Sequence, residues 1–185
     1  EVRNWDIVNF LIGTGCRVGS VPHVRVRDID FDNMTVQLSR VKTRTAYQIP
    51  LAKELAKVLR LYMMYFSHVF SDKQDSFWLF PNQYEEQLTS DGLKHAMADY
   101  NKSRGVTRTS LHDYRRAYAL NHLRLGGTIE QLRELLGHKD ISTTVKYFKL
   151  QIDDLKQNYD EHNLLNTVAA EVKKRQRGET IKRKK

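Results

Sequence analysis

The chain has 185 residues and a mass of 21.7 kDa, a size typical of one domain with or without a tail rather than two full domains. Its residues are 40% hydrophobic and 10% aromatic, which suffices to bury a core and excludes a disordered chain. No apolar run approaches the roughly 20 residues of a membrane-spanning helix. The single cysteine, Cys16, excludes a disulfide framework and a cysteine-based zinc site and favours a reducing cytoplasm.

The positive charge is concentrated at the C-terminal end. The net charge is +9 and the isoelectric point about 9.6, which favours a polyanionic partner. Residues 173–185 hold eight lysines and arginines and one acid, Glu179, so they contribute +7 and the other 172 residues only +2. We expect a domain over residues 1–172 and a disordered basic tail over 173–185.

Hydrophobic periodicity predicts the first elements. A helix is expected over residues 5–12, and Gly13 and Gly15 end it. The period then changes to two, which predicts a strand over 24–31, a tight turn, a second strand over 34–38, a hairpin over 40–44 and a third strand over 47–49.

After Pro50 the pattern is helical to about Phe70, followed by a polar loop over 67–76 and a short apolar run over 77–80. Thr89 marks a helix start. Further helices are expected over residues 110–125, 128–136 and 142–147, and a final amphipathic one over 152–172. The predicted fold class is therefore α+β, mainly α: a helical domain with a small three-stranded antiparallel sheet.

Several polar residues lie where packing does not require them. Arg17 follows a glycine break after an apolar helix, and Lys42 lies at a hairpin tip. His112 and Arg115 are three residues apart at a helix start, so both project from one face.

A second pair follows near the end of the domain. His138 comes directly after Gly137 in a break between helices, and Tyr147 comes nine residues later. Taken with the two arginines, the lysine and the first histidine, this set lacks the carboxylates that hold Mg²⁺. It suits a metal-free reaction at a phosphodiester.

The chemistry of such a set is specific. Arginine clamps the nonbridging oxygens of a phosphodiester bidentately and stays charged. A tyrosine can attack as a phenolate if nearby cations or a histidine help to remove its proton. The departing sugar oxygen needs an acid, which a lysine in a cationic pocket can supply.

Five segments resemble the boxes of the tyrosine recombinase (phage integrase) family, in the family's order over roughly residues 7–150. T-G-C-R at 14–17 resembles T-G-L-R, and V-R-V-R-D-I-D at 24–30 resembles L-x-x-x-D-I-D. Lys42, nine residues before Leu51 of an I-P-L segment, matches the family's hairpin lysine. H-D-Y-R at 112–115 resembles H-x-L-R, and L-L-G-H followed by S-T-T and Tyr147 resembles L-G-H-x-x-x-x-T-T-x-x-Y.

The resemblance implies a role for each matched residue. Tyr147 would be the nucleophile that forms a 3′-phosphotyrosyl link and frees a 5′-hydroxyl. Arg17 and Arg115 would bind the scissile phosphate, and Lys42 would protonate the leaving oxygen. His112 would assist proton transfer, and His138 would donate to a nonbridging oxygen. Nearby, Arg116 and Lys139 are expected to contact DNA.

The resemblance also implies the biology. It identifies a site-specific recombinase or integrase, interpreted here as that of a mobile element, acting in the cytoplasm and on the nucleoid without a metal or other cofactor. Its partner would be double-stranded DNA, on which a homotetramer assembles through the C-terminal helix. An accessory DNA-bending or directionality protein would be a further partner, and no membrane would be involved. The sequence leaves open docking of that helix in cis or in trans.

Two departures and two rival functions accompany the resemblance. Ser20 stands where the family often has an acid three residues after the first arginine. The sequence begins with Glu1, and the family's N-terminal helix and DNA-clamping domain are not seen before it. The rivals are an inactive DNA-binding protein of the same fold and a type IB topoisomerase. The other five histidines have no metal-ligand spacing and are interpreted as structural: His23, His68, His95, His122 and His162.

Overall fold

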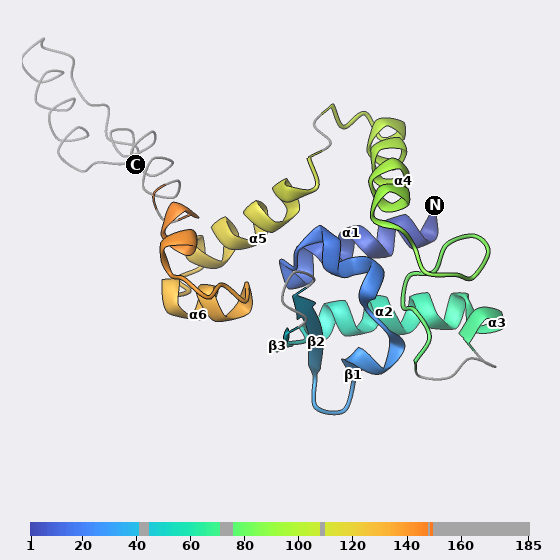
Figure 1. Cartoon of the computed structure of the whole chain (residues 1–185), viewed down its shortest axis with the longest axis horizontal. Helices are drawn as coiled ribbons and strands as arrows, with labels where there is room; N and C mark the ends of the chain where they lie inside the picture. The colour runs from blue at the N-terminus through green and yellow to red at the C-terminus, as the bar shows by residue number, and fades with distance from the viewer. Residues whose placement is uncertain (41–44, 71–75, 108–109, 148, 150–185) are drawn as a thin grey trace, which may run out of the picture.

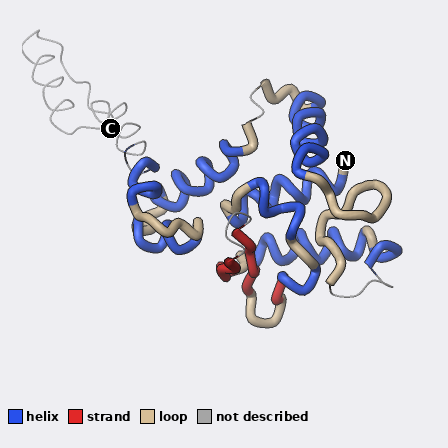
Figure 2. The backbone as a smooth tube through the Cα atoms, in the orientation of Figure 1, coloured by secondary structure: helices blue, strands red, loops and turns tan. Residues whose placement is uncertain are grey.

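The computed structural model describes residues 1–40, 45–70, 76–107, 110–147 and 149 of the chain. These residues are mostly helical, and the strands lie together between α2 and the α5–α6 part of the chain (Figure 1; Figure 2). The elements are, in chain order, α1 (Val2–Thr14), η1 (Val18–His23), η2 (Val26–Asp28), β1 (Ile29–Asp30), β2 (Thr35–Arg40), β3 (Thr45–Pro50), α2 (Lys53–Tyr65), α3 (Ser67–Phe70), α4 (Ser90–Ser103), α5 (His112–Arg124) and α6 (Ile129–Leu135). Residues 142–147 are also helical. The predicted fold class is confirmed.

The sheet is three-stranded and antiparallel, in the order β1-β2-β3. The predicted hairpin is confirmed, because β2 and β3 pair over their whole length. Val36 and Leu38 are fully buried, whereas the alternate residues Gln37 and Ser39 are exposed. This period-two pattern places one face of the sheet on the core.

The predicted first strand, residues 24–31, is wrong over most of its length. Only Ile29–Asp30 pairs with β2, and a 3₁₀ turn, η2, precedes it. The Asp28 carboxylate accepts a hydrogen bond from the Arg25 backbone N–H at 2.8 Å, which curls the chain locally. Arg25 instead forms an isolated antiparallel bridge with Trp78, more than fifty residues later.

The helix predicted after Pro50 is divided, and the predicted loop begins later than expected. α2 ends at Tyr65, and α3 covers Ser67–Phe70, the four residues where the predicted helix and the predicted loop overlap. The Tyr62 ring accounts for this second helix, because it contacts the Phe66, Phe70 and Phe80 rings at centroid distances of 5.1, 5.8 and 5.5 Å.

Helix starts follow the sequence closely. Thr89 caps α4, since its Oγ1 accepts a hydrogen bond from the Gly92 N–H at 3.0 Å. Thr128 and Gln131 form a reciprocal capping box at the start of α6. These local hydrogen bonds fix where α4 and α6 begin.

The apolar interior forms two clusters of unequal size. The larger one joins α1, α2, α4 and the sheet, with Phe10, Leu38 and Leu59 among its fully buried members. The smaller one lies between α5 and α6 and consists of four buried residues, Ala119, Leu123, Leu132 and Leu136. In Figure 1, α5 and α6 extend to one side of the larger body, and α5 packs against α1.

Three predicted features lie outside the described residues: the hairpin tip with Lys42, the amphipathic segment 152–172 and the basic tail 173–185. Among the described residues, no helix has the length and apolar character needed to cross a membrane.

Candidate active site

Arg115 lies at the junction of the two apolar clusters. It is on the first turn of α5 and only 5% exposed. Its Nη1 donates to the Gly15 carbonyl at 2.7 Å, and its Nη2 donates to the Leu136 carbonyl at 2.8 Å. Nη2 also lies 2.8 Å from Nε2 of His138. One guanidinium therefore connects the end of α1 to the turn after α6.

His138 is buried, at 6% exposed, and its hydrogen bonds define its tautomer. A guanidinium has only donors, so His138 Nε2 accepts the hydrogen bond from Arg115. The neutral ring therefore carries its proton on Nδ1, which lies 2.8 Å from Oγ1 of the fully buried Thr144. Thr144 accepts that hydrogen bond and holds the ring plane in position.

Tyr147 lies beside His138. Residues 142–147 return the chain toward α6, and the Tyr147 ring lies nearly parallel to the His138 ring, with 6.4 Å between centroids and 6° between planes. The tyrosine is half-buried against the small α5–α6 cluster. The nine-residue spacing seen in the sequence thus corresponds to direct proximity of the two rings.

Arg17 and His112 are both exposed near this group. Gly15 ends α1 with a left-handed backbone, φ +59°, and Arg17 follows two residues later. The Gly15 carbonyl accepts from Arg115, so the turn that carries Arg17 is bound directly to the second arginine. His112 is the first residue of α5.

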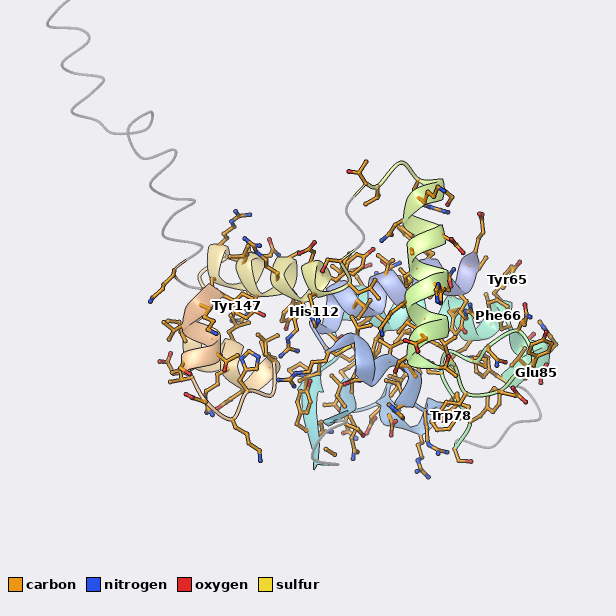
Figure 3. The ribbon with its side chains drawn as sticks, turned by 45° about the horizontal axis from the view of Figure 1, so that its top comes forward. Tyr65, Phe66, Trp78, Glu85, His112 and Tyr147 are labelled. Atoms are coloured by element: carbon orange, nitrogen blue, oxygen red, sulfur yellow. The ribbon has the colours of Figure 1, made fainter. Side chains whose placement is uncertain are left out.

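Figure 3 shows His112 at the start of α5 and Tyr147 on the α6 side, both far from Glu85.

Ser20, at the position where an acid was expected, also has a defined contact. It is buried, and its Oγ donates to the Ser39 carbonyl of β2 at 2.9 Å. Its backbone N–H donates to the Arg17 carbonyl at 2.8 Å. The serine therefore ties the Arg17 turn to the β2–β3 hairpin through neutral hydrogen bonds.

The structure brings together Arg115, His138 and Tyr147 and places Arg17 at the adjoining turn. Lys42 lies outside the described residues. Arg116 and Lys139 are exposed next to Arg115 and His138, respectively.

Two tyrosines near the site had no role in the sequence interpretation. Tyr47 on β3 is half-buried, and burial raises its pKa, although the nearby Arg115 and Arg17 charges lower it. Tyr118 on α5 is also half-buried, and burial raises its pKa too. In the sequence, Tyr47 is visible only as a strand residue and Tyr118 only as a helical aromatic, so no motif indicates that either lies at the site.

The electrostatics of the site are positive. The buried Arg115 donates hydrogen bonds to two carbonyls and to a neutral imidazole, and none of these three groups is a carboxylate. A buried cation with neutral partners favours an anionic ligand. Cys16, beside Arg17, is fully buried, and burial raises its pKa to about 11, so its thiol stays protonated. No cluster of three or more His, Cys, Asp or Glu able to hold a metal ion occurs within the described ranges.

A mainly helical fold with a small antiparallel sheet, and a tyrosine grouped with arginine and histidine, define the class of tyrosine recombinase catalytic domains. The model of the phage integrase family matches residues 1–153. The chain belongs to this family.

Similar proteins agree with this assignment. Tyrosine recombinase XerC of Leptospira interrogans (strain Fiocruz L1-130) is 28% identical over 160 residues, covering 86% of this chain and 50% of the relative. Tyrosine recombinase XerA of Pyrococcus furiosus is 27% identical over 171 residues, covering 91% and 57%. This chain thus spans about half the length of these relatives.

Solved structures show the same fold. A crystal structure of XerA recombinase superimposes with a TM-score of 0.73 and 26% identity, covering 88% of this chain and 59% of that one. The XerH recombinase in its post-cleavage complex with a palindromic difH substrate gives a TM-score of 0.69 at 18% identity, covering 86% and 45%.

Proposed function

We propose that this chain is the catalytic domain of a site-specific recombinase that cleaves and rejoins DNA strands through a 3′-phosphotyrosyl intermediate. The observation that carries the proposal is the buried Arg115, hydrogen-bonded to His138, with the Tyr147 ring beside that histidine. A donor for phosphate oxygens and a candidate nucleophile are thereby placed in one group.

The proposed reaction is a transesterification. The Tyr147 hydroxyl loses its proton and its oxygen attacks the scissile phosphorus, so a tyrosyl–phosphate bond forms to the 3′ end. The bond to the 5′ oxygen breaks, and that oxygen takes a proton from Lys42. A 5′-hydroxyl can then attack the phosphotyrosine and reverse the sequence, joining strands without a nucleotide cofactor.

The arginines stabilise the charge that develops in this step. Arg17 and Arg115 would bind the nonbridging oxygens, and each donor aimed at them can contribute about 3–4 kcal/mol of transition-state stabilisation. His112, exposed at the start of α5, would accept or relay the tyrosine proton. The carbonyl partners of Arg115 fix its fork before any substrate arrives.

His138 is proposed to donate to a phosphate oxygen, which requires a change at one atom. Its Nε2 accepts from Arg115 in the structure. A phosphate that enters between the two residues would take the Arg115 hydrogen bond for itself. Nε2 must then bind a proton from solvent to donate to the phosphate, while Nδ1–H keeps its hydrogen bond to Thr144.

Double-stranded DNA is the proposed partner. The solved neighbour XerH is described with a difH substrate, and this chain presents Arg116 and Lys139 on the surface beside the site. Exposed cations of this kind bind backbone phosphates without reading sequence. The basic residues 173–185 would add phosphate contacts of the same kind.

The wider assignment follows the family. We propose a catalytic domain over residues 1–172 and a basic tail over 173–185, in a recombinase of a mobile element that acts on DNA of the cytoplasm and nucleoid. Segment 152–172 would link protomers in a homotetramer on DNA, with an accessory bending or directionality protein as a further partner.

Covalent trapping tests the proposed reaction. The chain is incubated with nicked duplexes of randomised sequence in EDTA and quenched in detergent. We expect a protein–DNA adduct that survives chelation and is lost in Tyr147→Phe. Tyr84→Phe is the matched control, because it makes the same replacement of tyrosine by phenylalanine outside the site. Tyr84 lies on a loop and is 73% exposed.

Three results would contradict the proposal. DNA binding without any adduct from the wild-type chain would indicate an inactive DNA-binding protein. An adduct that persists in Tyr147→Phe would exclude Tyr147 as the nucleophile. Relaxation of supercoiled DNA without strand exchange would indicate a type IB topoisomerase.

A further inference from the structure

Two glycines beside the site have left-handed backbones and are each covered by a tyrosine ring. Gly15 has φ +59° and precedes Arg17 by two residues, and Gly137 has φ +61° and directly precedes His138. A methyl group on Gly15 would lie 2.3 Å from Cδ1 of Tyr118. A methyl group on Gly137 would lie 2.9 Å from Cε2 and Cζ of Tyr47.

These contacts cross between the two apolar clusters in both directions. Gly15 ends α1 in the larger body, and its tyrosine comes from α5. Gly137 follows α6, and its tyrosine comes from β3 in the larger body. Because each glycine lacks a Cβ, each ring approaches the backbone itself, and the separation of the two regions is set by these ring–backbone contacts.

Of the two tyrosines, Tyr47 is the one that covers the turn carrying His138. It pairs with the fully buried Leu38 across the hairpin, so its strand is fixed in the core. Its ring lies against the residue before His138. Burial raises the pKa of its phenol, and the charges of Arg115 and Arg17 oppose that effect.

We propose that Tyr47 is a positioning residue of the cleavage reaction: its ring holds the Gly137–His138 turn against β3 and so aligns His138 and Arg115 with Arg17. The inference rests on the proposed strand cleavage, which it refines. A displacement of about 1 Å among such groups can slow a reaction about 100-fold.

Tyr47 is not expected to replace Tyr147 as the nucleophile. Burial raises the pKa of its phenol, which disfavours the phenolate needed for attack. Its ring atoms, rather than its hydroxyl, are the atoms closest to Gly137. The ring is therefore the part of the side chain that contacts the Gly137 turn.

Substitution at Tyr47 separates the ring from the hydroxyl. For Tyr47→Ala we expect single-turnover adduct formation about 10–100-fold slower, with the Kd for the same DNA changed less than about threefold, because phosphate contacts on the surface remain. Tyr47→Phe restores most of the rate, because it keeps every ring atom in contact with Gly137. Tyr84→Ala serves as the control for loss of a tyrosine ring at an exposed position.

A double-mutant cycle tests the same contact if Tyr47→Ala folds poorly. Gly137→Ala places a methyl group in collision with the Tyr47 ring and also strains a left-handed backbone position. The strain is the same whatever residue 47 is, whereas the collision disappears when the ring is reduced. We therefore expect Gly137→Ala to slow adduct formation more in the wild-type background than in Tyr47→Leu.

Each outcome has a definite meaning. Equal rates for wild type and Tyr47→Ala would overturn the inference while leaving strand cleavage in place. A Tyr47→Phe rate as low as that of Tyr47→Ala would also overturn it, because the hydroxyl would then be the active part. A wild-type chain without any adduct would overturn the proposed function, and the inference with it.

Discussion

The body formed by α1–α4 with the sheet and the lobe formed by α5, α6 and residues 142–147 are stabilised in different ways. The body buries a continuous apolar cluster that includes large side chains such as Phe10 and Phe80. Among the described residues, the lobe has a small cluster of its own with four buried apolar residues. It therefore depends on contacts with the body, and the most direct of these is Arg115.

This difference explains where the site lies. A residue that connects two units must be held by both, so its position is better defined than that of a residue on either surface. Arg115 is bonded to the end of α1 and to the turn after α6, and Tyr147 packs on the lobe side of the same junction. The residues proposed for catalysis thus also hold the lobe against the body. Variants can distinguish the effect on the cleavage rate from the effect on stability.

Arg115→Ala is expected to have the largest effect. Its removal leaves the Gly15 and Leu136 carbonyls without this donor, which lowers the free energy of unfolding by about 2–4 kcal/mol. Adduct formation falls at least about 100- to 1,000-fold, because a phosphate donor is lost. Urea denaturation and single-turnover trapping measure the two effects.

Leu59→Ala on α2 is the control in the body. It costs about 2–5 kcal/mol of stability through a cavity, but below the unfolding transition its cleavage rate stays close to that of wild type. A similar loss of rate in both variants would show that general destabilisation, rather than the junction, governs activity.

Gly15→Ala sharpens the comparison by changing only the contact between α1 and α5. Adding a Cβ to this left-handed backbone lowers the free energy of unfolding by about 1 kcal/mol. The collision with the Tyr118 ring lowers it by about a further 1–3 kcal/mol. Gly105→Ala is the matched control, with φ +71° and, among the described residues, no atom within 4 Å of the added methyl group. Equal destabilisation of the two variants, measured by urea unfolding, would contradict close packing at the junction.

Asp6→Asn is expected to give the smallest effect, and it lies in the body alone. Asp6 on α1 is 4% exposed, and burial raises its pKa to about 6. Because this folded value exceeds the unfolded one, the folded chain binds the proton more tightly and loses stability as the pH rises through 6. The amide removes this loss, so we expect a gain of about 1–2 kcal/mol at pH 7.5 that disappears near pH 4.

Asp30 on β1 provides a control whose stability effect has the opposite pH dependence. The Asn33 side chain holds the pKa of Asp30 below its usual range, so this carboxylate stabilises the fold above its unfolded pKa and stops doing so as the pH falls. Asp30→Asn should therefore be destabilising at neutral pH. A pH-independent difference between Asp6→Asn and wild type would contradict the burial of an ionisable group at that position.

Local signals in the sequence were reliable where the interaction itself is local. The caps at Thr89 and Thr128 bond to residues three positions away, and the hairpin pairs neighbouring strands, so both could be predicted. The strand over 24–31 failed because its partner, Trp78, is more than fifty residues distant. Alternating hydrophobicity does not distinguish a sheet strand from a buried extended segment of this kind.

The candidate site shows the same difference between features with a sequence pattern and long-range contacts without one. Spacing and family resemblance indicated that Arg115, His138 and Tyr147 belong together, and the structure places them together. The Tyr47–Gly137 contact joins residues ninety positions apart and leaves no local pattern. The role of Lys42 stays a prediction, because it lies outside the described residues.

The most direct test of the account is to map the residue that carries DNA. The trapped adduct is digested with protease and nuclease, and the nucleotide-bearing peptide is sequenced by mass spectrometry. We predict a 3′-phosphoryl nucleotide on Tyr147 and a 5′-hydroxyl on the released strand. A nucleotide on any other residue, or a released 5′-phosphate, would contradict the account.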